Sequence, residues 1–148
     1  MTIEIDFEPL HRTLRELRER ADDVSPAWEK WGDEIVLEEA QQFALLGVRF
    51  GSAWAALSPK YARWKALHYP GKPIMRLTDR LMDSLTKRPM GVERVSSKSA
   101  EFGTDVPYAH WHQDGTSKMP KREIMAETSV LAAHAKRLIT RHIVKGDL

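Results

Sequence analysis

The first apolar pattern in the chain lies between residues 6 and 23 and predicts a helix. Apolar residues recur at alternating gaps of three and four, which places them on one stripe with charged residues on the other side. Such a stripe can pack on its own domain or on a partner's helix, and it is too short to indicate a coiled coil. The stripe consists of Phe7, Leu10, Leu14, Leu17, Ala21 and Val24.

Two further helices are predicted at Ser-Pro pairs. Ser25 can cap a helix that runs from Pro26 to about Leu46, because proline suits the first helical position. Ser58 and Pro59 begin a shorter helix in the same way. The expected buried residues are Trp28, Trp31, Ile35, Phe43 and Ala44 in the longer helix and Tyr61, Trp64 and Leu67 in the shorter one.

The second half of the chain mixes helical and strand patterns. Residues 75–87 predict a helix that has Leu77, Leu81 and Leu85 on one side and Thr78 near its start as a candidate cap. Residues 91–105 alternate and are rich in Val, Ser and Thr, which indicates one or two strands with a turn near Lys98 and Ser99. Residues 108–111 could continue this sheet or leave it. Residues 115–125 are expected to form a loop that can hold an edge strand.

A last helix is predicted from Ala126 to about Val144. Its inner side comprises Val130, Leu131, Ala135, Leu138 and Ile139, and its outer side Lys136, Arg137, Arg141 and Lys145. The order of helices, small sheet and final helix predicts an α+β fold with N-terminal helices, a small antiparallel sheet in the second half and a C-terminal helix.

The net charge of +2 hides an uneven distribution along the chain. Residues 1–50 carry 6 Lys+Arg and 12 Asp+Glu, a balance of −6, whereas residues 51–148 carry 17 and 9, a balance of +8. This asymmetry indicates either contact with nucleic acid or an assembly interface, or an acidic helix that packs on a basic body. The length of 148 residues fits a single domain, with residues 1–50 as an acidic helical region and 51–148 as the core.

Composition excludes several classes of site. The chain has no Cys, so disulfides and thiolate zinc sites are excluded. The N-terminus lacks the pattern of a signal peptide, and the apolar run FALLGV is too short to cross a bilayer. Neither a Gly-rich phosphate loop nor a nucleophile elbow occurs in the sequence. We therefore expect a soluble protein without enzyme activity, cofactor or membrane contact.

The stretch YAHWHQDG holds the densest cluster of candidate chemistry. One hypothesis is a metal-dependent hydrolase that uses His110, His112 and Asp114, because residues i and i+2 of a strand face the same side. However, no further ligand lies at a suitable spacing, and no Glu follows as a general base. The sequence therefore disfavours a metal site.

The stretch LSPKYARWK allows a nucleic-acid interpretation. Tyr61 and Trp64 could stack on bases while Lys60, Arg63 and Lys65 contact phosphates. Helical spacing explains the same pattern with aromatic residues inward and charges outward, and that interpretation is favoured. The basic side chains of the last helix could likewise contact DNA, although a solvated face or a complement to the acidic half is favoured.

Five segments occur in order between Trp54 and Arg122: WAALSPKYARWK, MRLTDRLMDS, FGT, YAHWHQDG and MPKR. Together they resemble the phage virion morphogenesis family, the tail completion proteins of Mu-like and related tailed phages. The residues that carry the resemblance are Trp54, Leu57, Pro59, Tyr61, Lys65, Leu77, Thr78, Leu81, Ser84, Gly103, Tyr108, Ala109, His112, Gln113, Gly115, Pro120 and Arg122.

The chain departs from the family pattern at three places. The usual T-G is Thr78–Asp79 here, Met75 replaces a Leu, and REIM replaces R-x-F-L. A Gly after Thr78 would mark a turn or a close backbone approach, whereas Asp79 favours a capped helix start. Residues 1–50 carry no motif of the family.

The resemblance implies a structural role. Family members finish the phage tail and stabilise its joint to the head, and they are not known as enzymes. The implied partners are tail tube or terminator proteins and head-tail connector proteins, in the tail or neck of the virion and in the host cytoplasm during assembly. A ring of identical subunits is expected, because the joint must match the rotational symmetry of the tube.

The resemblance also implies local roles. His112 and Gln113 would fix a turn by satisfying backbone groups, and Gly115 would supply a positive φ. His110 is expected to be exposed. The loops Tyr69–Ile74 and Gly115–Lys121 are candidates for contact with partners, because such loops can project and become ordered on assembly.

Overall fold

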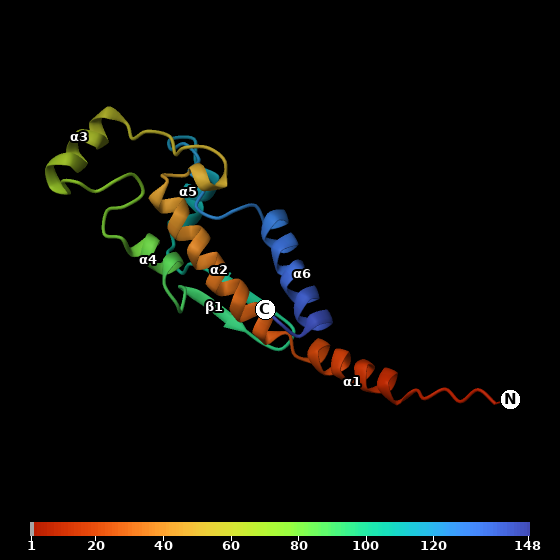
Figure 1. Cartoon of the computed structure of the whole chain (residues 1–148). Helices are drawn as coiled ribbons and strands as arrows, with labels where there is room; N and C mark the ends of the chain where they lie inside the picture. The colour runs from red at the N-terminus through yellow and green to blue at the C-terminus, as the bar shows by residue number, and fades with distance from the viewer. Residues whose placement is uncertain (1) are drawn as a thin grey trace.

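The computed structural model describes residues 2–148, and its fold is α+β (Figure 1). The predicted order of N-terminal helices, small sheet and C-terminal helix is confirmed. The elements are α1 (Glu8–Asp22), α2 (Ser25–Ala44), the short 3-10 helix η1 (Val48–Phe50), α3 (Pro59–His68), α4 (Arg80–Thr86), β1 (Val92–Val95), β2 (Ala100–Gly103), α5 (Ala109–Asp114) and α6 (Thr128–Lys145).

Helix α2 lies at the centre of the core. It packs against α6, α4 and both strands. Ile35 and Phe43 point from it into the apolar cluster, whose other buried members are Trp54, Leu81, Leu85, Met90, Val106, Ala109 and Ile124. Ala44, which was predicted to be buried, is exposed. Phe43 takes the core-facing position, and the next residue lies about 100° further around the helix.

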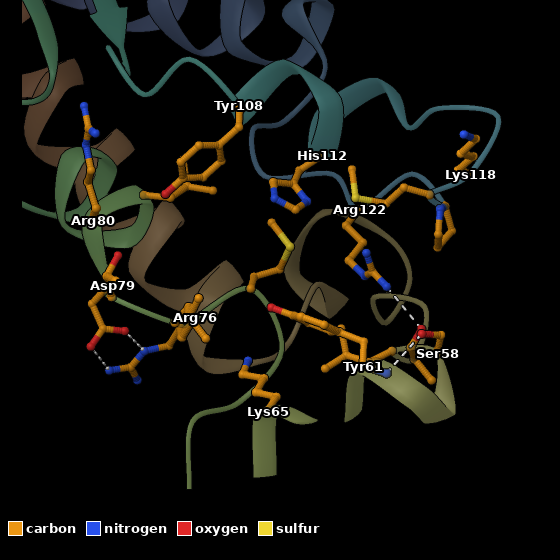
Figure 2. A pocket seen from close by; sticks show the side chains of 18 residues that line it. Ser58, Tyr61, Lys65, Arg76, Asp79, Arg80, Tyr108, His112, Lys118 and Arg122 are labelled. Atoms are coloured by element: carbon orange, nitrogen blue, oxygen red, sulfur yellow. Dashed lines mark hydrogen bonds and ion pairs between the residues drawn. The ribbon is translucent and has the colours of Figure 1, made fainter. Parts of the chain in front are cut away.

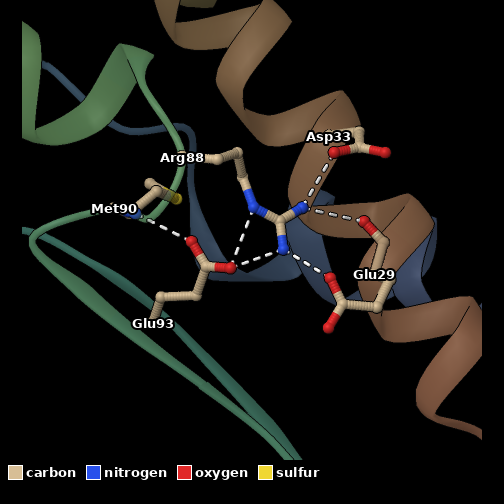
Figure 3. Close-up of polar contacts among 5 residues, drawn as sticks. All are labelled: Glu29, Asp33, Arg88, Met90 and Glu93. Carbon is tan, nitrogen blue, oxygen red and sulfur yellow. Dashed lines mark hydrogen bonds and ion pairs between the residues drawn. The ribbon is translucent and has the colours of Figure 1, made fainter.

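Arg88 ties α2 to the strands (Figure 3). Its Nη1 donates to the carboxylate of Asp33 at 2.8 Å and to the backbone carbonyl of Glu29 at 3.1 Å, and its Nε donates to the carboxylate of Glu93 at 2.8 Å. The guanidinium also lies 5.8 Å from the ring centre of Phe102. Part of the acidic first half is thus neutralised within the fold by a basic residue of the second half.

The two strands form an antiparallel hairpin. Val92 lies opposite Gly103, and the backbone amide of Ser96 donates to the carbonyl of Ser99 at 2.8 Å to close the turn. The predicted strands and turn are therefore confirmed. The edge strand allowed for residues 115–125 does not form, and that segment makes a single isolated bridge between Thr116 and Met119.

Two local predictions fail near the motifs. The helix predicted over residues 75–87 begins only at Arg80, because Met75 and Asp79 have φ values of 65° and 62° that a right-handed helix cannot contain. Asp79 occupies the cap position without a side-chain cap bond, so Thr78 is not the cap. After the sheet the chain leaves it, and residues 109–114 form helix α5 instead of a strand.

Helix α6 follows most of its prediction. Ala135 and Leu138 are buried, and the four basic residues assigned to its outer side are exposed. Val130 was predicted to lie inside and is exposed, because it lies about 100° around the helix from the half-buried Leu131. Among residues 2–148, no helix combines the length and the apolar character needed to cross a bilayer.

Helix α1 projects from one end of the molecule (Figure 1). None of its residues is buried, and Phe7, Leu10 and Leu14 of the predicted stripe are each more than half exposed. Its C-terminal end is held by α6, where the ring Nε2 of His142 lies 3.0 Å from the carbonyl of Asp23. The N-terminal half of the stripe is therefore largely uncovered within the described chain, whereas Leu17 and Ala21 are half-buried and Val24 is buried.

Candidate functional site

Residues 55–79 form an arm that carries α3 away from the body (Figure 1). The side chain of Ser58 caps the helix by accepting from the backbone amide of Tyr61 at 3.4 Å. Lys65 is the one buried residue of α3, and its ammonium group donates to the carbonyl of Pro73 on the returning segment. Burial lowers the pKa of Lys65. This bond links the two sides of the arm.

The apolar face of α3 does not face a core. Tyr61 is 41% exposed, Trp64 40% and Leu67 81%, so the prediction of inward aromatic residues is wrong. Trp64 stacks with the rings of Tyr61 and His68, at centroid distances of 5.4 and 4.9 Å. The arm therefore presents aromatic and aliphatic surface to solvent.

A largely apolar groove of about 640 Å³ lies between the arm and the body (Figure 2). Ten of the residues that carry the family resemblance line it, and they come from four of the five sequence segments. These residues are Leu57, Tyr61, Lys65, Leu77, Thr78, Leu81, Tyr108, His112, Pro120 and Arg122. Motifs that are separate in the sequence thus meet on one surface.

Other motif residues hold the base of the arm. The Arg122 guanidinium donates to the carbonyls of Ala55 and Ala56, from Nε at 2.9 Å and Nη2 at 3.1 Å. The indole Nε1 of Trp54 donates to the carbonyl of Glu123 at 2.7 Å. The segment around Arg122 and the start of the arm are therefore fixed to each other by buried side chains.

Gln113 fixes the segment that follows α5. Its Oε1 accepts from the backbone amides of Ile124 at 2.8 Å and Met125 at 3.0 Å, and its Nε2 donates to the carbonyl of Met125 at 2.9 Å. Gly115 has a φ of 75°, as predicted, and a Cβ there would lie 2.7 Å from the backbone nitrogen of Lys121. These residues shape the loop that forms one rim of the groove.

The remaining motif positions support the core beside the groove. The hydroxyl groups of Ser84 and Thr104 are hydrogen-bonded at 2.6 Å, which joins α4 to the end of β2. Ala109 is buried in the apolar cluster, and Gly103 is the last residue of β2. Pro59 occupies the first position of α3.

The groove is basic as well as apolar. Its lining holds one carboxylate, Asp79, beside five cationic side chains: Lys65, Arg76, Arg80, Lys118 and Arg122. Within residues 2–148, Arg76 is the only one of these five that has an ion-pair partner, and that partner is Asp79. The surface therefore carries an excess of positive charge that the described chain does not neutralise.

His112 points into the groove from α5 (Figure 2). Burial, assisted by the charge of Arg122, lowers the pKa of its imidazole and so favours the neutral ring. Its Nδ1 is buried and finds no hydrogen-bond partner in the described chain, so the expected bond from the ring to a backbone group is absent at that atom. The link to the neighbouring segment runs instead through its backbone carbonyl, which accepts from the amide of Arg122 at 2.7 Å.

The geometry behind the metal hypothesis does not occur. His110 and His112 lie on a helix, where residues two apart point about 200° away from each other. His110 is exposed, as expected, while His112 lines the groove. Among residues 2–148, no group of three His, Cys, Asp or Glu side chains is placed to hold a metal ion.

Sequence reasoning missed several lining residues. Met75, Arg76, Asp79 and Arg80 line the groove. They lie in the segment MRLTDRLMDS, but none of them was among the residues named as carrying the resemblance. The signal was present in the departures from the family pattern at Met75 and Asp79, where both residues have positive φ. Of the two loops proposed for contact, Gly115–Lys121 supplies part of the groove rim and Tyr69–Ile74 belongs to the arm.

In a comparison with family models, the chain matches the phage virion morphogenesis family over residues 5–140. The match includes most of the N-terminal region, where the sequence shows no motif. No match to a curated protein or to a solved structure was found. Because the family model covers most of the 148 residues, the chain belongs to the phage virion morphogenesis family and has a structural role in virion assembly.

Proposed function

We propose that this protein completes the phage tail and helps to join it to the head at the neck, acting by protein–protein assembly. The observation that carries the proposal is the convergence of ten motif residues on the groove beneath the arm. The motif residues outside the groove hold this surface in shape, through bonds such as that from Trp54 to Glu123. The family resemblance is thus concentrated on a surface and its supports.

The physical character of the surface fits a protein partner. Projecting aromatic and aliphatic side chains next to an apolar groove mark interaction sites, because soluble proteins rarely leave such patches open. Trp64 and Leu67 on the arm are of this kind. The anchored base of the arm reduces the ordering that binding requires, which favours affinity.

The proposed partners are tail tube or terminator proteins and head-tail connector proteins. Assembly takes place in the host cytoplasm, and the finished protein lies in the tail or neck of the virion. A joint on a tail tube shares its rotational symmetry, so the protein forms a ring of identical subunits there. Recognition rests on complementary shape and charge, and the mechanism needs no covalent chemistry, cofactor or metal.

DNA binding is the second candidate function, and one observation supports it. Tyr61 and Trp64 are exposed beside Lys60 and Arg63. Their exposure removes the main reason for preferring an inward orientation of these rings over contact with bases. However, Trp64 is already stacked with Tyr61 and His68, which leaves less of its ring available to bases. This function predicts binding to DNA that weakens steeply between low and physiological salt and that Trp64→Ala reduces.

The experiment that tests the proposed function is deletion of the gene in the parent phage or prophage, followed by electron microscopy of the lysate. Tail completion predicts full heads and free tails that lie apart and that join when purified protein is added. Normal joined particles in the absence of the gene would overturn the proposal.

A further inference from the structure

The N-terminal segment of this chain has unsatisfied apolar surface. In residues 2–8, Ile3, Ile5 and Phe7 alternate with Glu4, Asp6 and Glu8. The three apolar side chains are 84%, 66% and 55% exposed, and Leu10 and Leu14 of α1 are also more than half exposed. An exposed run of this size on a protein with an otherwise ordered core marks a surface that meets a partner.

The groove beneath the arm has the complementary chemistry. It offers an apolar interior and five cationic side chains beside one carboxylate. Arg80 and Lys118 are exposed at its edges and form no ion pair in the described chain. An extended segment in which apolar and acidic residues alternate could place its apolar side chains inside and its carboxylates at this basic rim.

The same molecule cannot bring the two together. The N-terminus and α3 lie at opposite ends of the structure, with the lengths of α1 and α2 between them (Figure 1). Those helices of 15 and 20 residues are roughly 22 and 30 Å long, whereas residues 2–7 span at most about 20 Å. The segment therefore has access only to the groove of another copy.

We infer that residues 2–10 of one subunit bind in the groove beneath the arm of the next subunit. The contact joins two different surfaces of the same chain, and repetition of such a head-to-tail contact generates a ring when the rotation between copies closes. The ring of subunits in this inference rests on the proposed function. The contact between the two surfaces, and the charges that make it specific, are argued from the structure alone.

The test uses a labelled peptide with the sequence TIEIDFEPL and the full-length protein, diluted until it is monomeric. Fluorescence anisotropy should show saturable binding that weakens as salt rises, because part of the attraction is between charges. Arg80→Glu with Lys118→Glu should weaken binding by about tenfold or more. A peptide that carries Lys in place of Glu4, Asp6 and Glu8 should fail on the natural protein and bind the doubly changed protein.

A matched control is Lys136→Glu with Arg137→Glu, which makes the same charge change on the outer side of α6 and should leave binding unaltered. Absence of binding, or binding that both double variants weaken equally, would overturn the inference. The groove would be assigned to nucleic acid instead if single-stranded DNA displaced the peptide and the doubly changed protein did not bind the Lys-substituted peptide. If the peptide does not bind but heads and tails still need the protein to join, the inference is wrong and the proposed function stands. If the peptide binds but particles join normally in the deletion strain, the inference stands and the proposed function is wrong.

Discussion

Arg76 donates from Nε to Oδ1 of Asp79 at 2.8 Å, while the backbone of Asp79 is left-handed with a φ of 62°. Lys72 bonds to the other carboxylate oxygen. The family pattern has Gly at this position, and Gly adopts positive φ without steric cost. Here an Asp takes that conformation and is held by two cations from the arm. The turn that ends the arm is therefore stabilised by charge where the family uses backbone freedom.

Asp79→Asn and Asp79→Ala should separate charge from backbone conformation. Asn tolerates positive φ but loses the ion pairs, whereas Ala loses both, so the melting temperature should fall in the order natural protein, Asn variant, Ala variant. Thermal unfolding followed by circular dichroism at pH 7 measures this order. An Ala variant as stable as the Asn variant would show that the left-handed backbone carries no penalty here.

The charge at Asp79 also predicts a pH dependence. The hydrogen bond from Arg76, with that from Lys72, holds the pKa of Asp79 well below its usual range. A lowered folded-state pKa contributes stability that is present above the ordinary value of 3.8 and is lost as pH falls below it. The difference in melting temperature between the natural protein and Asp79→Asn should therefore shrink on acidification. A difference that is constant down to pH 2 would contradict this account.

Glu39 should make the protein less stable as pH rises. It is 1% exposed, and burial, with the charge of Glu38, raises its pKa to about 9. A raised folded-state pKa gives stability that is complete below the ordinary value of 4.5 and is lost as pH rises toward 9. Glu39→Gln should flatten this dependence and raise the free energy of unfolding at pH 8 by more than about 1 kcal/mol. Urea unfolding across this pH range is the measurement, and parallel profiles for the two proteins would refute the assignment.

Gln113→Ala should destabilise the rim of the groove. It leaves the amides of Ile124 and Met125 without their acceptor, which costs on the order of 3 kcal/mol of folding free energy. Hydrogen exchange should quicken at those two amides and in residues 115–121 before it quickens in α2. His110→Ala is the control on the same helix, because His110 is exposed and should change stability by less than about 0.5 kcal/mol. Slow exchange at both amides in the Gln113 variant would contradict the role given to this side chain.

The sequence predicted the helices and strands that have a local pattern. Its predictions were wrong where the orientation or the start of a helix depends on contacts with residues distant in the sequence. Helix α2 and the β1–β2 hairpin occur close to their predicted places. The predicted cap at Ser25 is wrong, because Ser25 is the first residue of α2 and Val24 takes the cap position without a side-chain cap bond. The predicted cap at Ser58 of α3 is confirmed. The prediction that Trp64 faces inward was wrong, because helical spacing shows which residues share a face and not where that face points. The predicted start of α4 was wrong, because the positive φ at Asp79 depends on cations that come from the arm.

Ten of the residues that line the groove were named from the sequence, but their arrangement in space was not predictable. Motif positions such as Tyr61 and Arg122 were named from the resemblance, yet their meeting in one groove depends on the path of the arm. The His110 and His112 pair appeared suitable for a metal only while a strand was assumed.

The arm and the groove are proposed to form the surface through which this protein joins the phage tail to the head. Leu67→Glu tests this proposal most directly. Leu67 is 81% exposed on the arm, so the change should leave stability within about 0.5 kcal/mol. Leu37→Glu is the matched control, because Leu37 is 62% exposed on α2 and belongs to neither the arm nor the groove. The measurement is the fraction of joined particles, counted by electron microscopy, after each purified protein is added to a lysate from the deletion strain. The account predicts joining with the natural protein and with Leu37→Glu, and separate heads and tails with Leu67→Glu. Equal joining with all three proteins would contradict it.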